Sequence, residues 1–213
     1  MSKVTLYHAP QTRSSGAAVL VEELGADVEV KILNMKAGEQ RQPAFLAVNP
    51  MGKVPAVVDG DALITEQGAI YIYLADRFPE RSLAPAIGDP LRGPYLRWLV
   101  FYGSSFEPAC VDKALKREPG RAAMLPYGDY DTTLRTVTDQ LKRGPYILGE
   151  RFTAADLLWG GALNWITMFG IVDKTPEIAA YVERVTSRPS FAKVNARDAE
   201  LVAAHEKAAK GGA

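Results

Sequence analysis

The sequence predicts an α/β part followed by an all-helical part. Strand and helix signals alternate over residues 1–79, as they do in a small mixed sheet with helices on its faces. Further along the chain, apolar residues recur at helical spacing and no strand pattern returns. Prolines and glycines punctuate the chain between the two patterns, which is typical of a linker. We therefore expect a first domain over residues 1–79, a linker over 80–88 and a helical domain over 89–213.

Each element of the α/β part has a local signal. The segment Val28-Glu-Val-Lys-Ile-Leu33 alternates at period two, as a half-buried strand does. Gly25 marks the end of the helix before it, and Asp59-Gly60 fits a tight primed hairpin turn. The expected elements are, in order, strand 4–7, helix 17–24, strand 28–33, short helix 43–48, a hairpin turning at 59–60, and helix 66–78.

The helical part has its clearest signal at Thr153-Ala-Ala-Asp156. This spacing predicts a capping box, in which each side chain accepts a hydrogen bond from the other residue's backbone. Gly144-Pro145 ends the helix before it, and Pro108 is a weak point in a long first helix. The expected helices span 92–115, 129–143, 154–169, 176–187 and 189–204.

The composition argues against several classes of function. The chain has 25 Lys and Arg residues against 25 Asp and Glu residues, whereas a nucleic-acid-binding protein usually shows a basic excess. No apolar run approaches the roughly 20 residues of a membrane helix, so we expect neither a nucleic-acid nor a membrane partner. One cysteine, Cys110, and two histidines, His8 and His205, are too few for a disulfide framework or a His/Cys metal cluster. The first residues enter a strand pattern without a signal peptide, so a cytoplasmic location is expected.

Residues 49–76 carry the strongest functional signal. A strand there starts at Val54-Pro55, and a cis proline at that point would leave neighbouring backbone groups free to pair with an extended peptide. A helix opens soon afterwards at Glu66-Gln67, and its first N–H groups and positive dipole end favour a carboxylate. The two features together predict a site for a small acidic peptide.

Three motifs occur in order along the chain. They are Asn49-Pro-Met-Gly-Lys-Val-Pro55, the helix start Glu66-Gln67 with Ala69-Ile70 and Tyr73-Leu74, and Gly149-x-x-Phe-Thr-Ala-Ala-Asp156. With these motifs the chain resembles, over essentially its whole length, the cytosolic glutathione S-transferase family, in particular bacterial Ser/Thr-type, theta-, phi- or beta-like members. The resemblance implies a thioredoxin-like N-terminal domain, an α-helical C-terminal domain, a homodimer and a role in detoxification. It also implies glutathione as the co-substrate, and no metal is expected.

The resemblance also implies which residues hold the glutathione peptide. The backbone of Val54, beside Pro55, would pair with the cysteinyl residue of glutathione. Glu66 would bind the ammonium group of the γ-glutamyl residue, and Gln67 would bind its carboxylate. Gln67 departs from the Ser or Thr that is usual in the family, although its amide can still donate a hydrogen bond.

The glycine carboxylate of glutathione needs cations or amide donors. The positions that match the family are Gln40, Arg41 and Lys53. Lys53 is favoured because it adjoins Val54-Pro55, whereas a solvated polar surface is an equal alternative for Gln40 and Arg41.

The loop after the first strand carries hydroxyl groups that could activate the glutathione thiol. Lowering a thiol pKa from about 8.5 by two units requires roughly 2.7 kcal/mol. One hydrogen bond to a charged acceptor contributes about 1.5–3 kcal/mol, and a helix N-terminus about 0.3–1 kcal/mol.

The resemblance places Thr12 where the family has its catalytic serine, with Ser14 as the next candidate and helix capping as the alternative role for Thr12. Tyr7 matches the catalytic tyrosine of other classes, but a core aromatic is favoured there. Arg13 stands where beta-class members carry a cysteine, so no covalent chemistry through a protein thiol is expected there.

A stripe of aromatic residues in the first long helix is the candidate wall of an electrophile site. Trp98, Tyr102 and Phe106 recur at four-residue steps, and this helix lines the cleft in the family. Such stripes are more often part of a core, so both interpretations stay open. Cys110 continues the stripe and is interpreted as a small buried hydrophobic residue. His8, at the end of the first strand, is a further candidate for contact with the electrophile.

The predicted function is transfer of glutathione, in which bound thiolate attacks a small hydrophobic electrophile. One alternative stays within glutathione chemistry: reduction of disulfides or peroxides, or reductive cleavage of an ether or halide. Another is a non-catalytic binding module with the same fold, favoured by Gln67 and by the missing serine at position 12. The hydroxyls of Thr12 and Ser14, with Lys53 and Glu66, favour the enzyme.

Overall fold

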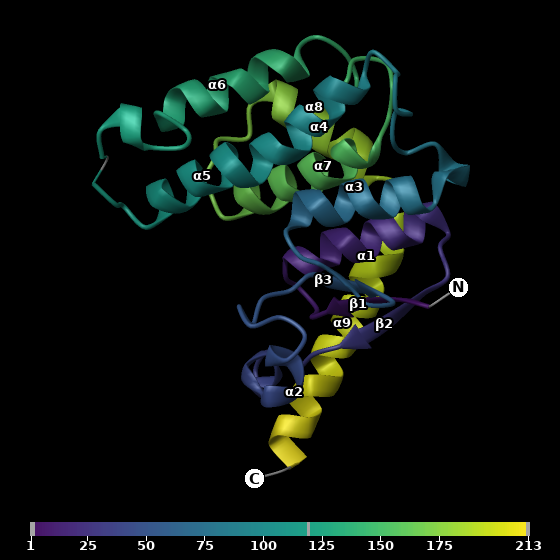
Figure 1. Ribbon diagram of the computed structural model, residues 1–213. Helices are drawn as coiled ribbons and strands as arrows, with labels where there is room; N and C mark the ends of the chain where they lie inside the picture. Colours follow the sequence, from purple (N-terminus) through teal and green to yellow (C-terminus); the bar gives the residue numbers. More distant parts are fainter. Residues whose placement is uncertain (1–2, 119, 212–213) are drawn as a thin grey trace. The chain divides into compact units, whose positions relative to one another are not determined.

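The computed structural model describes residues 3–118 and 120–211 (Figure 1). The chain divides into two compact units. The first unit combines residues 1–81 with residues 189–213, and the second spans residues 82–188. The expected α/β part and helical part are both present.

The first unit is built on a four-stranded mixed sheet with the order β2-β1-β3-β4. Its strands are β1 (Val4–His8), β2 (Val28–Ile32), β3 (Ala56–Asp59) and β4 (Ala62–Ile64). Strand β1 runs parallel to β2 and antiparallel to β3. The hairpin turns through Gly60, whose φ of 60° suits the first position of a tight primed turn. The sheet therefore has the predicted mixed topology.

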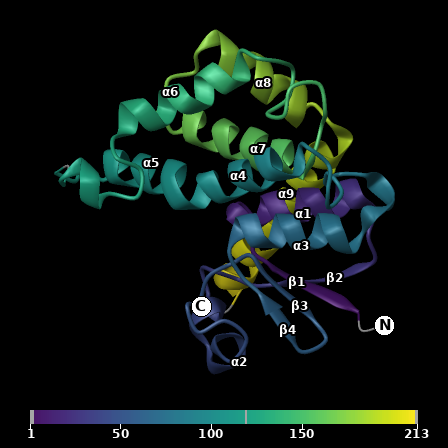
Figure 2. The same ribbon diagram turned by 45° about the horizontal axis from the view of Figure 1, so that its top comes forward.

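Three helices of the first unit come from the α/β part of the sequence. They are α1 (Arg13–Leu24), α2 (Pro43–Leu46) and α3 (Gln67–Arg77). Helix α1 begins at Arg13 rather than at the expected Ala17, because Thr12 caps it by accepting the N–H of Ser14. Gly25 ends the helix in the left-handed conformation, with a φ of 57°. Helix α1 packs on β1 and α3 (Figure 2).

The last helix, α9 (Pro189–Gly211), also belongs to the first unit. The expected division, with a linker at 80–88, put residues 189–213 in the helical domain, whereas α9 groups with the sheet; residues 212–213 lie outside the described part. Helix α9 lies along α1 (Figures 1 and 2). The Ser190 hydroxyl donates to Glu23 at 2.7 Å, and Lys193 pairs with Glu22. Helical spacing predicted the helix but not the surface that it covers.

The second unit consists of helices α4 (Arg92–Phe101), α5 (Glu107–Ala114), α6 (Tyr130–Leu141), α7 (Ala154–Met168) and α8 (Pro176–Thr186). Residues 102–106, between α4 and α5, form a π-helical turn in which the N–H of Glu107 donates to the carbonyl of Tyr102. The expected helix 92–115 is thus interrupted just before Pro108. Proline lacks an N–H and clashes with the carbonyl four residues earlier, so a wider turn there is favoured.

The predicted capping box at the start of α7 is confirmed. Asp156 accepts the N–H of Thr153 at 2.8 Å, and the Thr153 side chain caps the helix in return. Asp156 also accepts the N–H of Ile147 at 2.7 Å and the hydroxyl of Tyr181 at 2.8 Å. The box therefore ties α7 to α8 and to the segment before it.

Candidate functional site

A half-buried hydroxyl stands at the N-terminus of α1. The Thr12 Oγ1 atom is 2.8 Å from the carbonyl of Ala9, to which it donates. It is also 2.7 Å from Ser14 Oγ and accepts the N–H of Ser14 at 3.2 Å. Thr12 therefore caps the helix and keeps part of its surface exposed. A ligand thiol at this point would meet both a hydroxyl and a helix N-terminus.

Ser14 differs from the expectation that it is a second group for the thiol. It is fully buried. Its Oγ atom lies 2.8 Å from His8 Nδ1 and accepts the N–H of Ala9 at 3.0 Å. Because no part of Ser14 is exposed, it lies behind Thr12 rather than beside a bound thiol.

His8 also differs from the expectation that it contacts an electrophile. Its side chain is fully buried, and each ring nitrogen already faces a protein group. Nδ1 faces Ser14, and Nε2 lies 2.8 Å from Asp198 Oδ1. The alternation of side chains along β1 explains this placement, since His8 and Tyr7 point to opposite faces of the sheet. Tyr7 instead packs against Phe45, with ring centroids 5.4 Å apart.

Asp198, on α9, is a residue of this cluster that sequence reasoning missed. Its Oδ2 atom accepts the hydroxyl of Ser15 at 2.6 Å and the N–H of Gln11 at 3.0 Å. Burial alone would raise the pKa of Asp198, but hydrogen bonds from His8, Ser15 and Gln11 outweigh burial and hold it below its usual range. No local signal in the sequence could have connected this residue to a strand so far away along the chain.

The loop before β3 offers an open stretch of backbone. The Val54–Pro55 peptide bond is cis. Among residues 3–118 and 120–211, the N–H and C=O of Val54 find no hydrogen-bond partner in the protein. The Asn49 side chain donates to the carbonyl of Lys53 at 2.8 Å and so holds the loop. These free groups can pair with an extended peptide, as an open sheet edge does.

The start of α3 lies close to this loop and to α1. The register of β1 and β3 pairs Tyr7 with Ala56, so the loop that follows β1 and the loop that precedes β3 share one edge of the sheet. The Gln67 amide nitrogen donates to the carbonyl of Arg13 at 3.3 Å, which brings the first turns of α1 and α3 together. Three predicted features therefore converge: the Thr12 hydroxyl, the Val54 backbone and the N-terminus of α3.

Glu66 and Gln67 occupy distinct environments at this N-terminus. Glu66 is exposed and has a φ of 63°, in a region that residues other than glycine rarely adopt. Such strain is commonly found at ligand sites. The Gln67 Oε1 atom is buried without a partner in the part of the chain that the structure describes. That free atom is an oxygen, which accepts hydrogen bonds as a carboxylate does. A ligand carboxylate here would therefore be bound by the first N–H groups of α3 rather than by Gln67.

The residues expected for the second carboxylate are brought together at Gly52. This glycine is buried, with a φ of 60°. A Cβ atom on it would lie 2.8 Å from the carbonyl oxygen of Gln40 and 2.9 Å from Arg41 Nη1. Arg41 also donates to the carbonyl of Met51 at 3.4 Å. The turn that holds Gln40 and Arg41 therefore packs against Gly52. Lys53, the next residue, is exposed.

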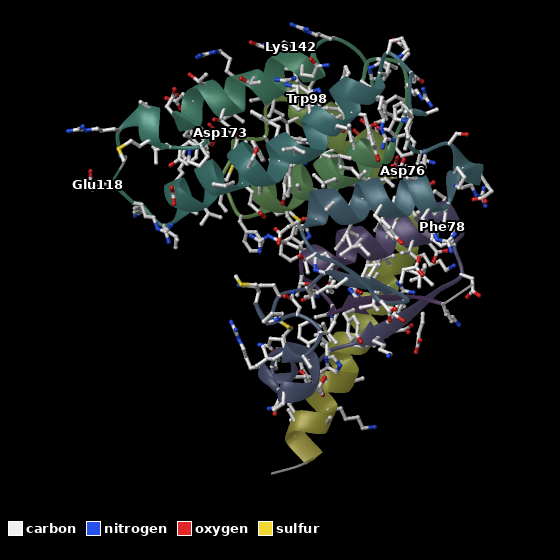
Figure 3. All side chains as sticks on the ribbon, in the orientation of Figure 1. Asp76, Phe78, Trp98, Glu118, Lys142 and Asp173 are labelled. Carbon is white, nitrogen blue, oxygen red and sulfur yellow. The ribbon has the colours of Figure 1, made fainter. Side chains whose placement is uncertain are left out.

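The expected electrophile wall lies in the core of the second unit. Trp98, labelled in Figure 3, is 2% exposed, Tyr102 is 4% exposed and Phe106 is 0% exposed. All three surround Trp159, and its ring centroid lies 4.9 Å from that of Phe106. This corrects the electrophile assignment: the four-residue stripe faces α7, and its rings pack within the unit.

Cys110 is buried, as interpreted from the sequence. Burial raises the pKa of its thiol to about 12, and Glu107 adds to this effect while Lys113 opposes it. A thiol with this pKa is not a nucleophile near neutral pH.

The described residues show neither a metal centre nor a membrane-spanning helix. No group of three or more His, Cys, Asp or Glu side chains is placed to hold a metal ion in residues 3–118 and 120–211. None of the helices in those residues is both long enough and apolar enough to cross a membrane.

A mixed four-stranded sheet with a cis-proline loop, followed by a helical unit, defines the class of thioredoxin-like proteins with an added helical domain. Residues 2–76 match the N-terminal domain of glutathione S-transferases, and residues 129–189 match the C-terminal domain. The chain belongs to the glutathione S-transferase family.

Relatives and solved structures agree with this family. Glutathione S-transferase 3 of Zea mays is 29% identical over 209 residues, which cover 91% of this chain and 93% of the relative. A glutathione transferase structure from Methylococcus capsulatus is 30% identical, with a TM-score of 0.76, covering 92% of this chain and 98% of the other. The structure of a sphingomonad glutathione S-transferase complexed with glutathione is 29% identical, also with a TM-score of 0.76 and covering 92% and 98% of the two chains.

Proposed function

We propose that this protein is a glutathione transferase that conjugates bound glutathione thiolate to small hydrophobic electrophiles. The observation that carries the proposal is the half-buried residue Thr12, whose hydroxyl stands at the N-terminus of α1. It stands next to the sheet edge that carries the free backbone of Val54. Family membership further supports a homodimer that works in the cytoplasm in detoxification.

The γ-glutamyl end of glutathione would bind at the start of α3. Its carboxylate would meet the free N–H groups and positive dipole end of this helix. Its ammonium group would pair with Glu66, which is exposed there. Gln67 supports this end chiefly by holding α3 against Arg13.

The remaining peptide would continue along the loop before β3. The cysteinyl residue would pair with the N–H and C=O of Val54, which places its side chain beside the loop that carries Thr12. The glycine carboxylate would lie near Lys53 and the turn that holds Gln40 and Arg41. Lys53 and Arg41 are both solvent-exposed. Their positive charges favour this orientation because they attract the negatively charged carboxylate.

The thiol would be activated by Thr12. A free thiol has a pKa near 8.5, and a two-unit decrease corresponds to about 2.7 kcal/mol. A hydroxyl that donates to the thiolate contributes about 1.5–3 kcal/mol, and the N-terminus of α1 adds about 0.3–1 kcal/mol. These contributions suffice to ionise the thiol near neutral pH. The thiolate then attacks the electrophile, and the leaving group departs with the displaced electron pair.

The test is a pH titration of thiolate ultraviolet absorbance with glutathione and protein. S-methylglutathione serves as the blank, because its sulfur carries no proton. The proposal predicts thiolate well below the pKa of the free thiol, and no thiolate with glutathione bound would overturn it. Detection of a thioether product with an electrophile, rather than oxidised glutathione, separates conjugation from reductive chemistry.

A further inference from the structure

The loop between β1 and α1 turns at Gln11, whose backbone is left-handed. Gln11 has a φ of 55°, in a region that residues other than glycine rarely adopt. The residue is exposed, so packing of its side chain does not compensate for this conformation. Thr12, the next residue, caps α1. The conformation of Gln11 therefore determines where Thr12 and the N-terminus of α1 lie.

A buried carboxylate on α9 holds this turn. The N–H of Gln11 donates to Asp198 Oδ2 at 3.0 Å, and the Ser15 hydroxyl donates to the same oxygen at 2.6 Å. The other oxygen, Oδ1, lies 2.8 Å from His8 Nε2. Asp198 is 3% exposed. It therefore binds the end of β1, the turn and the first residues of α1 at the same time.

The other hydrogen bonds of the loop do not reach Gln11. The hydroxyls of Thr12 and Ser14 donate to the carbonyl of Ala9 at 2.8 and 3.0 Å. The N–H of Ala9 donates to Ser14 Oγ at 3.0 Å. These bonds connect the residues on either side of Gln11, whereas its own N–H is held by α9.

Asp198 is a strong acceptor because it is ionised at neutral pH. Burial alone would raise its pKa, but hydrogen bonds from His8, Ser15 and Gln11 hold the pKa below its usual range. Hydrogen bonds to an ionised oxygen are stronger than those between neutral groups. The bond to Gln11 therefore offsets the cost of its left-handed backbone. Without the carboxylate, Gln11 would return to a right-handed or extended conformation and move Thr12.

We propose that Asp198 is a positioning residue that holds Gln11 in its left-handed conformation and so places the N-terminus of α1 beside the glutathione thiol. The inference rests on the proposed function and extends it to a residue of the last helix. Asp198 itself touches neither the peptide nor the thiol. Its effect on the thiol passes through the backbone of residues 11–12.

The test compares Asp198→Ala with the wild type in the thiolate titration. The substitution removes both oxygens, so the N–H of Gln11 loses its acceptor. We expect the pKa of the bound glutathione thiol to rise by about one unit, which is a tenfold loss of thiolate at a pH below both values. Calorimetric affinity for S-methylglutathione should change by less than about twofold, because the turn does not carry Val54 or the start of α3. An unchanged thiol pKa in the folded variant overturns the proposal.

Glycine at position 11 should restore the thiol pKa. Glycine adopts a left-handed backbone without the cost that other residues have. We therefore expect the double variant Asp198→Ala with Gln11→Gly to recover at least half of the pKa change. Gln11→Ala is the matched control, because alanine also lacks the long side chain but keeps the cost, and it should restore nothing. Equal thiol pKa values in the two double variants would overturn the role of the turn.

Ser190→Ala is the control on α9. It removes a hydrogen bond of 2.7 Å from α9 to Glu23 on α1 without touching Asp198, so we expect an unchanged thiol pKa. An equal rise in Ser190→Ala and Asp198→Ala would contradict the proposal, since both substitutions would then act by loosening α9.

Hydrogen exchange of the wild-type protein tests the same contact without relying on a folded variant. The N–H of Gln11 belongs to an exposed residue, but we expect it to exchange at least tenfold more slowly than an unprotected amide, because Asp198 holds it. Exchange at the unprotected rate would overturn the inference. If the wild type shows no thiolate with glutathione bound, the proposed function fails instead, which separates the two outcomes.

Discussion

The carboxylate of Asp198 lies 2.8 Å from the imidazole of His8, although 190 positions separate the two residues in the sequence. One residue stands at the end of the first strand, and the other stands on the last helix. The contact therefore links the loop that carries Thr12 to the far end of the chain. It makes α9 part of the structure behind the candidate thiol site.

Thr12→Val should raise the pKa of the bound glutathione thiol by about 1–2 units, since the lost hydrogen bond contributes about 1.5–3 kcal/mol. Valine has a similar shape and no hydroxyl. Thr12→Ser is the matched control and should keep the wild-type thiol pKa. The measurement is the thiolate absorbance titration. Equal pKa values in Thr12→Val and wild type would remove Thr12 from the mechanism.

Gly52→Ala should weaken glutathione binding and lower the free energy of unfolding. The left-handed conformation costs alanine about 1–2 kcal/mol, and its Cβ would lie 2.8 Å from the Gln40 carbonyl oxygen. Gly170→Ala is the control, since Gly170 has a similar φ of 66° and a Cβ added there would meet nothing within 4 Å. Both variants should lose stability in urea unfolding, but only Gly52→Ala should lose calorimetric affinity for S-methylglutathione. Equal affinities in both variants would contradict this role of the turn.

Gly160→Ala should destabilise the second unit through contact with Val185. A Cβ on Gly160 would lie 2.5 Å from Val185 Cγ1, where α7 and α8 pack together. Overpacking of this kind costs about 1–3 kcal/mol. In the double variant with Val185→Ala, urea unfolding should show a smaller loss than the sum of the single losses. Strictly additive losses would show that the two residues do not meet.

Asp156→Asn should change the pH dependence of stability. Burial raises the pKa of Asp156 to about 6, against opposing hydrogen bonds led by the N–H of Ile147. A raised pKa contributes stability that is complete below the unfolded value near 3.8 and is lost as the pH rises through about 6. The stability difference between wild type and Asp156→Asn should therefore shrink by about 1–3 kcal/mol between pH 4 and 7.

Asp129→Asn is the control for this pH dependence. The N–H of Thr132 is the largest of the effects that lower the pKa of Asp129 at the start of α6. A lowered pKa contributes stability that is complete above the unfolded value and is lost only as the pH falls through the folded value. The difference in free energy of unfolding between wild type and Asp129→Asn should therefore stay constant between pH 4 and 7. A flat profile for Asp156→Asn as well would contradict the raised pKa.

Local signals in the sequence predicted most of the fold. The period-two segment at residues 28–33 is strand β2, and the spacing Thr153 to Asp156 is a capping box. The candidate peptide site was predicted from the same kind of signal, because a proline at a strand start and a helix N-terminus are features of short segments. Each of these depends on residues that are neighbours in sequence.

Contacts between distant segments could not be predicted in this way. The spacing of Trp98, Tyr102 and Phe106 indicates one apolar face of a helix, but not that Trp159 covers it. The same limit applies to α9, whose helical pattern says nothing of its position beside α1. From the sequence alone, His8 is an ordinary polar residue at the end of a strand. Only the tertiary structure shows that Asp198 lies against it. Periodicity identifies a face, and only the tertiary structure identifies its partner.

The placement of α9 in the first unit has a consequence for the order in which the chain folds. A ribosome makes the chain from its N-terminus, so residues 82–188 emerge before Pro189–Gly211. The helical unit can therefore acquire all its residues while the sheet unit still lacks its last helix. His8 then has no carboxylate partner until α9 has been synthesised. The candidate thiol site is therefore completed only after the helical unit has been made, although Thr12 is made well before that unit.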